Sequence, residues 1–297
     1  MNLILGTSSN YDIPNLRAFA LSMKKHCDAD AVLLVDKTPR NVLTWLGRQG
    51  VVTREFSIPN MPPHQARFFG YHEFLSRHER YERIFITDVR DVIAQGDLFS
   101  SPHLEPGLHV FREDPRLPLG GDKLVSDWIR LWYGEEWHGR LAEKTIICSG
   151  TTFGDRASML CYLDTMLAEF RAKHRENEKF KREFSDQGPH NKLAYSGELA
   201  ENLERIGMKL HIRHNGEAVL TAGLRDTFTI VQPGVVVNDD GSIPEIVHQY
   251  DRHFFLRTMV DYLYADRQPA FGKRYEKFAG RRMRPIKKLF WRILRNV

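Results

Sequence analysis

The sequence contains few cysteines and no long hydrophobic run, and each absence excludes a class of protein. Its 297 residues include three cysteines, Cys27, Cys148 and Cys161, with no CxxC pair. An odd, unpaired set argues against a disulfide framework and for a reducing compartment. No window approaches the roughly 18 continuous apolar residues of a membrane-spanning helix, and the short, uncharged start lacks the features of a signal peptide. We expect a cytoplasmic protein, either soluble or peripheral on a membrane.

Charge is unevenly distributed along the chain. The net charge is +5, yet the segment from Phe271 to Val297 alone holds ten Lys or Arg and one acid, Glu276, which makes +9. The preceding 270 residues therefore carry −4 of the total. A nucleic-acid-binding protein more often spreads basic residues over its fold. We therefore expect no nucleic-acid partner for this mildly acidic body.

Strand and helix signals alternate in the first half, which is typical of an α/β fold. Short apolar runs separated by helical patterns predict a mixed, mostly parallel central sheet flanked by helices, in one Rossmann-like domain. Ligands of such sheets bind beyond the carboxyl ends of the strands. The expected strands cover residues 3–5, 31–35, 51–56, 84–87, 108–111, 145–148 and 246–248, with further short strands within 209–237, and the expected helices cover 14–23, 42–46, 65–77, 155–171, a segment after 186, and 254–264.

The sharpest motif is a pair of acids after the strand at 84–87. Asp88 and Asp91 follow this apolar run, where a carboxylate faces the ligand edge of the sheet. Carboxylate oxygens suit hard cations such as Mg2+ or Mn2+. His248, at the end of a late strand, offers a nitrogen ligand to complete the site. The alternatives are an Asp-rich turn and a structural histidine.

Three further motifs contain residues suited to ligand contact. Asp186 and Gln187 stand at a helix start, where the acid is a base, a sugar contact or a plain N-cap. Ser149 and Gly150 follow the strand at 145–148, where small residues allow close approach to a ligand or simply form a loop. Arg67 lies one turn from Tyr71 on a helix and either pairs with phosphate or is a solvated surface residue.

This order of motifs resembles the GT-A glycosyltransferases, in particular bacterial, viral and plant enzymes that act on polysaccharides. The likeness is carried by the run from Arg67 to Phe99 and by the late histidine, and it spans residues 3–252. It implies that Asp88 and Asp91 occupy the DxD region, with two residues between the acids instead of one. It further implies metal binding by both acids and His248, a catalytic or sugar-binding role for Asp186, and donor-nucleotide contacts from Thr7, Asn10, Tyr11, Asp36, Arg67, Tyr71, Asp88, Ser149, Gly150 and Gln187.

The resemblance implies a domain over residues 1–268, with a nucleotide-binding half at 1–100 and an acceptor and sugar half at 101–268. The donor is then a UDP-, GDP- or dTDP-sugar, the acceptor is a glycan or lipid-linked hydroxyl, and Mn2+ or Mg2+ is the cofactor. A hexosyl or deoxyhexosyl transfer in cell-surface polysaccharide synthesis is the expected activity. A nucleotidyltransferase of similar fold is the first alternative, although the loop at 7–10 lacks the glycine and lysine of a phosphate-binding loop.

The basic tail at 269–297 has its own pattern. From Pro285 onward, apolar residues recur at helical spacing and basic residues lie off that stripe. Such a helix is expected to lie on an anionic membrane surface, here the cytoplasmic face. The alternatives are a terminal helix packed on the body, and a non-enzymatic membrane-binding or nucleic-acid-binding module driven by the tail.

Overall fold

One seven-stranded sheet organises the chain. The computed structural model describes residues 1–183, 185–223, 229–232 and 234–264. The strand order in this sheet is β3-β2-β1-β4-β7-β6-β8, and strands from both halves of the sequence share it. The strands are β1 (Asn2–Ser9), β2 (Asp30–Asp36), β3 (Val52–Glu55), β4 (Arg83–Thr87), β6 (Leu108–Arg112), β7 (Ile147–Asp155) and β8 (Leu210–Arg213).

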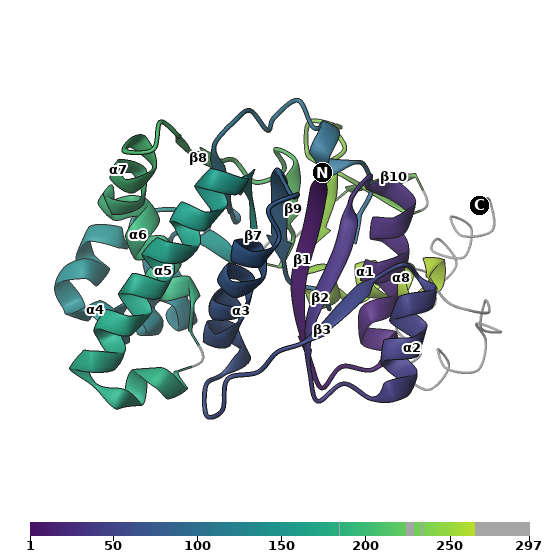
Figure 1. Ribbon diagram of the computed structural model, residues 1–297. Coiled ribbons are helices and arrows are strands. Elements are labelled where there is room, and N and C mark those ends of the chain that lie inside the picture. The colour runs from purple at the N-terminus through teal and green to yellow at the C-terminus, as the bar shows by residue number, and fades with distance from the viewer. Residues whose placement is uncertain (184, 224–228, 233, 265–297) are drawn as a thin grey trace, which may run out of the picture.

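The first half alternates strands and helices as predicted. Each neighbouring pair among β3, β2, β1 and β4 is parallel. The connecting helices are α1 (Ile13–His26), α2 (Arg40–Arg48) and α3 (Pro63–Arg77) (Figure 1). Asp12 caps the start of α1 in a capping box. Its side chain accepts from the Asn15 backbone N–H, and the Asn15 side chain accepts from the Asp12 backbone N–H. Because β7 runs antiparallel to both β4 and β6, the sheet is mixed but mostly parallel, which confirms the expected fold class.

Strand β7 extends beyond the strand predicted at 145–148. The interpretation of the residues after 148 as a loop is therefore wrong. Ser149 and Gly150 lie inside β7, which continues to Asp155. The pairing with β6 jumps from Cys148 to Thr152, so three residues bulge away from β6 while β7 stays paired with β4. Thr151 and Thr152 favour a strand conformation, and a bulge accommodates the small residues Ser149 and Gly150 within that strand.

The second half holds most of the remaining helices. The helix α4 (Lys123–Leu141) has no counterpart in the sequence prediction, and Gly134 within it has a φ of 79°, which interrupts the helical geometry. This kink explains why no single helical period covers the segment. The other helices are α5 (Arg156–Glu176), α6 (Gln187–Ser196), α7 (Glu198–Glu204) and α8 (Phe254–Leu263), with short 3-10 turns η1 (Leu98–Ser100), η2 (Leu119–Gly121), η3 (Glu178–Arg182) and η4 (Tyr250–Arg252).

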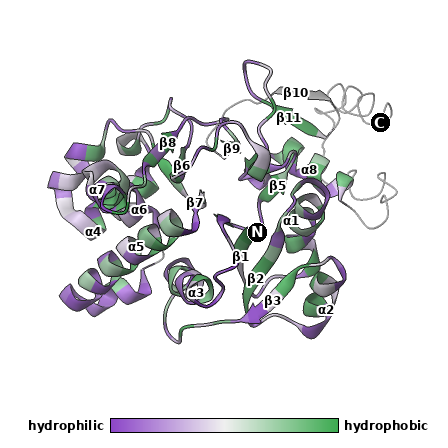
Figure 2. Cartoon of the chain, turned by 45° about the horizontal axis from the view of Figure 1, so that its top comes forward, coloured by the Kyte–Doolittle hydropathy of each residue, from purple (hydrophilic) through white to green (hydrophobic). Residues whose placement is uncertain are grey.

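The two faces of the main sheet bury separate hydrophobic cores because successive strand side chains point to opposite sides. Leu3 and Leu5 of β1 enter a core shared with α3, α4, α5, α6 and α7. Ile4, between them, enters a second core shared with α1 and α2. Figure 2 shows hydrophobic residues along the strands and on the helices beside them. Helices therefore cover both faces, which leaves the strand ends for a site.

A smaller sheet lies beside the second core and brings distant segments together. It has the order β5-β12-β9, with β5 (Val92–Ala94), β12 (Ile246–His248) and β9 (Val219–Thr221). The antiparallel pair β10 (Thr229–Gln232) and β11 (Val235–Val237) forms a third sheet. The strand predicted at 246–248 is confirmed as β12.

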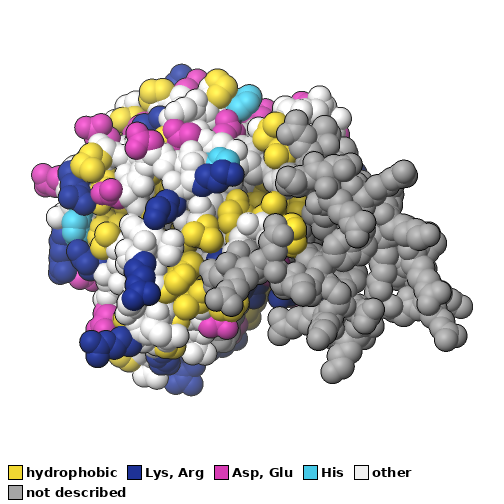
Figure 3. Space-filling view, turned by 90° about the vertical axis from the view of Figure 1, so that its right-hand side faces the viewer, with side chains coloured by type: hydrophobic (Ala, Val, Ile, Leu, Met, Phe, Trp, Pro, Cys, Tyr) yellow, Lys and Arg dark blue, Asp and Glu magenta, His cyan; other side chains and the backbone are white. Residues whose placement is uncertain are grey.

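The basic tail lies outside the described residues, so its predicted helix stays a prediction. None of the described helices has the length and apolar character needed to cross a bilayer. On the face seen in Figure 3, the described Lys and Arg side chains are scattered among acidic and hydrophobic ones.

Candidate active site

The acidic motif forms the connection between β4 and β5. Asp88 follows the last residue of β4 and Asp91 precedes the first residue of β5. The Asp88 backbone N–H donates to the Gly150 carbonyl at 2.8 Å, so the motif is tied to β7. Val89 packs against β1 at Gly6, where a Cβ would collide with its side chain. A glycine in β1 is thus needed to seat the turn that presents both carboxylates.

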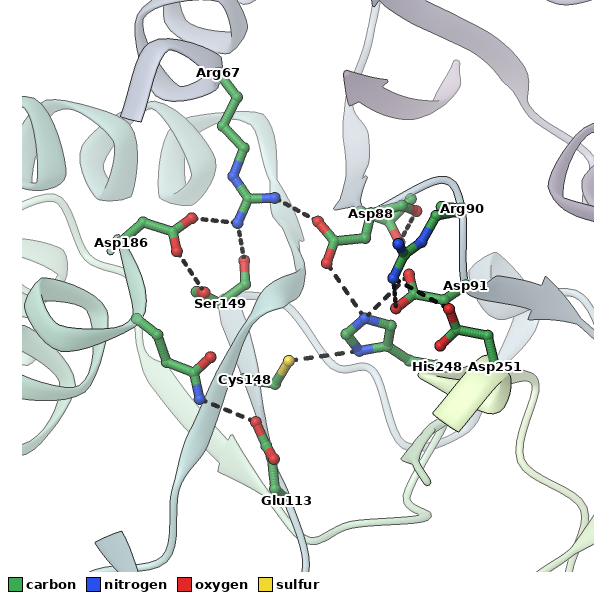
Figure 4. Close-up of polar contacts among 12 residues, drawn as sticks. Arg67, Asp88, Arg90, Asp91, Glu113, Cys148, Ser149, Asp186, His248 and Asp251 are labelled. Atoms are coloured by element: carbon green, nitrogen blue, oxygen red, sulfur yellow. Dashed lines mark hydrogen bonds and ion pairs between the residues drawn. The ribbon is translucent and has the colours of Figure 1, made fainter. Parts of the chain in front are cut away.

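His248 meets this motif through strand pairing. β12 runs antiparallel to β5, with His248 opposite Val92, the neighbour of Asp91. The imidazole Nε2 lies 3.4 Å from Asp88 Oδ2 and 3.8 Å from Asp91 Oδ1. One ligand atom from each of the three residues lies within 4.8 Å of the others (Figure 4). The three residues predicted to hold a metal are therefore together at one edge of the main sheet.

The donor set fits a divalent cation. Nε2 of His248 is buried and makes no hydrogen bond within the described part of the chain, which leaves a ligand nitrogen aimed at two carboxylates. Two carboxylates and one imidazole suit Mn2+ or Mg2+. Such a cation requires the deprotonated imidazole, so its binding competes with a proton on His248.

The charged groups of the cluster shift one another's pKa values. Burial alone raises the pKa of Asp88, but the Arg67 guanidinium and the His248 imidazole outweigh it and hold that pKa below its ordinary value. Burial raises the pKa of Asp91, with help from the charge of Asp88 and against the charge of His248. Burial opposes a charge on His248, yet Cys148 and the Asp88 carboxylate raise its pKa well above the ordinary value. The cluster thus holds a carboxylate beside a readily protonated imidazole.

Arg67 connects the metal-type cluster to Asp186. Its side chain is buried, and one guanidinium nitrogen lies 2.5 Å from Asp88 Oδ1. A second nitrogen pairs with Asp186 Oδ2 and donates to the Ser149 carbonyl at 3.1 Å. Arg67 is therefore not a solvated surface residue. Asp186 is the first residue before α6 but makes no side-chain cap, since its other oxygen accepts from the Ser149 hydroxyl at 3.1 Å.

Gly150 leaves no room for a side chain. A Cβ at this position would lie 2.5 Å from Asp88 Oδ2 and 2.7 Å from His248 Cε1. Cys148, two residues before Gly150 in β7, places its sulfur 3.4 Å from His248 Nδ1, on the other side of the ring from the carboxylates. The bulged part of β7 therefore forms the floor beneath the cluster.

Of the remaining nucleotide-contact predictions, Thr7, Asn10, Tyr11 and Asp36 lie at or just after the ends of β1 and β2, and Tyr71 lies in α3. Thr7 and Tyr71 place their hydroxyls 3.5 Å apart, but Tyr71 is buried. Asn10 donates through its backbone to the Asp36 carbonyl at 3.1 Å, and the pKa of Tyr11 is raised by burial, with smaller effects from Arg90 and the two motif acids. A pocket of about 520 Å3 opens here; its lining is Ser9, Asp36, Lys37, Ser57, Ile58, Pro59, Asn60, Met61, Pro62, Pro63 and Arg182.

An adjoining pocket of about 50 Å3 extends from Thr7 and Asp36 to Arg67. The two pockets share Ser9, Asp36, Ser57, Ile58, Met61 and Pro63. They therefore form a continuous hollow that runs from the strand ends toward the guanidinium that holds Asp88. Its combined size falls in the range of pockets for small ligands.

Sequence reasoning missed two charged contacts of the site. Glu113 follows β6 directly, is buried, and accepts from Gln187 Nε2 at 3.0 Å. The same strand-end rule that found Asp88 would have found it. Asp251 pairs with Arg90 at 3.1 Å and lies three residues after His248, but an ion pair between residues so far apart in sequence has no local signal.

The fold has counterparts among solved structures. No protein-family model matches the sequence, and no curated protein matches it. A crystal structure of the galactosyltransferase LgtC with donor and acceptor sugar analogues matches with a TM-score of 0.50, at 9% identity, over 84% of this chain and 86% of that one. A structure of an active-site mutant of LgtC matches with the same values. At this identity the match bears on the fold alone, and it supports the GT-A fold implied by the sequence resemblance.

Proposed function

We propose that this protein is a metal-dependent glycosyltransferase that moves a sugar from a nucleoside-diphosphate sugar to a hydroxyl of a glycan or lipid-linked acceptor. The observation that carries the proposal is the meeting of Asp88, Asp91 and His248 at the ligand edge of a GT-A fold. The likeness to LgtC, a galactosyltransferase, supports the same activity class.

The three ligand residues would hold Mn2+ or Mg2+. The cation, when bound, supplies positive charge that offsets the diphosphate as it leaves. The hollow from Asp36 to Arg67 would hold the nucleoside, because it runs from the strand ends to the guanidinium that pairs with Asp88. Hydroxyl and acidic side chains at its rim, Thr7, Ser9 and Asp36, suit ribose hydroxyls and a base edge.

The chain itself would position the sugar through Asp186 and Gln187. Both Asp186 oxygens are engaged, one by Arg67 and one by Ser149. With one oxygen paired to a buried guanidinium and the other bonded to a hydroxyl, this carboxylate is better placed to contact a sugar hydroxyl than to take up a proton. Arg67 also offsets the charge of Asp88 beside the anionic donor, so the site can bring two carboxylates close to a diphosphate.

The setting proposed from the sequence is cell-surface polysaccharide synthesis on the cytoplasmic face of a membrane. It rests on the dense basic charge of residues 269–297, since cationic segments bind anionic lipid surfaces. A lipid-linked acceptor would suit an enzyme held there.

A thermal-shift screen tests the proposal. UDP, GDP and dTDP are each added to the protein with Mn2+, with Mg2+ or with a chelator, and stabilisation by one nucleotide only when metal is present is the expected result. The Asp91→Asn variant should lose the metal-dependent part of the shift. Transfer or hydrolysis of the matching sugar nucleotide then confirms turnover. A protein that no nucleotide stabilises, with or without metal, would contradict the proposal.

A further inference from the structure

Glu113 is a buried carboxylate whose function the metal cluster does not explain. It lies directly after β6, with 3% of its surface exposed, and its backbone N–H donates to the Ile146 carbonyl at 2.8 Å. Its side chain points to the site from the side of β6, below Cys148 and apart from Asp88 (Figure 4). A buried acid needs a partner, and Gln187 Nε2 supplies one at 3.0 Å.

The chemistry of this contact selects one orientation of the Gln187 amide. An ionised carboxylate can only accept hydrogen bonds, whereas an amide has one donating and one accepting end. The nitrogen must therefore face Glu113, and the carbonyl oxygen turns away from it. Burial raises the pKa of Glu113, and the positive charges of His248 and Arg252 and the bond from Gln187 oppose the rise.

The backbone of Gln187 is held separately. Asn191, one turn later in α6, donates to the Gln187 carbonyl at 2.8 Å and to the Ile147 carbonyl at 2.8 Å. Its own oxygen accepts from the Ile147 N–H at 2.8 Å, so the first turn of α6 is fastened to β7. With the main chain held, the orientation of the Gln187 side chain depends chiefly on Glu113.

We propose that Glu113 is a positioning residue that holds the Gln187 amide with its carbonyl oxygen available to the donor sugar. The inference rests on the proposed function, because it needs a sugar beside Asp186 and Gln187. An oxygen presented to the sugar stabilises positive charge as it develops at the anomeric carbon, whereas an amide nitrogen in its place would oppose that charge. Glu113 thus acts on the sugar through Gln187.

A double-mutant cycle tests the inference with the full-length protein and the sugar nucleotide that the screen identifies. Glu113→Gln keeps the size of the side chain but permits both amide orientations. It should lower kcat about tenfold or more, the usual effect of losing a charged hydrogen bond, with donor KM changed less than about threefold. In a Gln187→Ala background the same change should cost less than about twofold, since the group that Glu113 orients is gone.

Two further variants separate orientation from charge and folding. Glu113→Asp retains an acceptor-only group and should keep more activity than Glu113→Gln. Glu169→Gln, which neutralises a mostly buried acid paired with Lys192 away from the site, should leave kcat unchanged. Melting temperatures measured alongside check that each variant folds.

The outcomes are distinct. Unchanged kcat in Glu113→Gln, or an equal loss with and without Gln187, overturns the positioning inference while wild-type turnover upholds the proposed function. If Glu113→Gln does not fold, Glu113→Asp takes its place in the double-mutant cycle. The inference then requires that Glu113→Asp lowers kcat less in the Gln187→Ala background than in the wild-type background. Absence of wild-type turnover with every sugar nucleotide overturns the proposed function and, with it, the inference.

Discussion

Nε2 of His248 lies 3.4 Å from Oδ2 of Asp88, although the two residues come from distant parts of the chain. The contact depends on the pairing of β12 with β5, which sets His248 opposite Val92. A cation site built in this way is assembled only when both strands are in register. Groups that position Asp88 beside His248, such as Arg67 and Gly150, are therefore needed for the site.

Replacing Arg67 should destabilise the protein and impair the site. Arg67→Met leaves the buried Asp186 and the partly buried Asp88 without their cation, and breaking a buried pair costs about 3–5 kcal/mol. The free energy of unfolding in urea measures the loss. Arg77→Met is the matched control on the same helix, because its ion pair with Glu73 is exposed and should contribute less than about 1 kcal/mol. Equal losses in both variants would mean that the bridge has no special role.

Adding one methyl group at Gly150 should weaken metal binding. In Gly150→Ala the new Cβ meets Asp88 Oδ2 and His248 Cε1, so at least one ligand must move. Disturbing the groups that orient metal ligands typically lowers metal affinity about 10-fold to 100-fold. A titration with Mn2+ followed by electron paramagnetic resonance measures this affinity. Gly139→Ala, in the exposed part of α4 with no atom near the new Cβ, should bind Mn2+ normally and gain up to about 1 kcal/mol of stability. Normal affinity in the Gly150 variant would show that the three ligands do not hold the ion.

Stability should fall in mild acid because of His190. Burial lowers the pKa of His190 to about 4, and its Nδ1 lies 2.7 Å from the Tyr162 hydroxyl. Between pH 6.5 and 4 the unfolded chain binds a proton that the folded chain does not, so stability decreases as pH falls, by about 3 kcal/mol at most. His190→Asn keeps an acceptor but cannot titrate, so urea midpoints should depend less on pH. The exposed His103→Asn should retain the full dependence, and a His190 variant that does the same would contradict this assignment.

The tail should control membrane binding and not turnover. A variant truncated after residue 268 should no longer sediment with anionic vesicles. It should still turn over a sugar nucleotide with a soluble acceptor. Glu in place of Lys287, Lys288, Arg292 and Arg295 should have the same effect in the full-length chain. Loss of turnover together with the tail would favour the non-enzymatic alternative, in which the tail is the functional part.

Local pattern was sufficient for much of the fold. Apolar runs bounded by polar residues located β1 through β4 and β12, because strand formation there follows from nearby side chains. The same rule located Asp88 and Asp91, since a strand end is a local feature. It failed at α4, where Gly134 interrupts the helical period, and at β7, where a bulge made a strand look like a loop.

The sequence by itself determined most of the strands and helices and placed Asp88 and Asp91 at a strand end, because hydrophobic period and capping act over a few residues. Only the tertiary structure decided that His248 faces Asp88, that Arg67 is buried between two carboxylates, and that Glu113 meets Gln187. Those contacts depend on strand register and helix packing between distant segments. The free energy of such pairings belongs to the whole fold, so no local pattern records them.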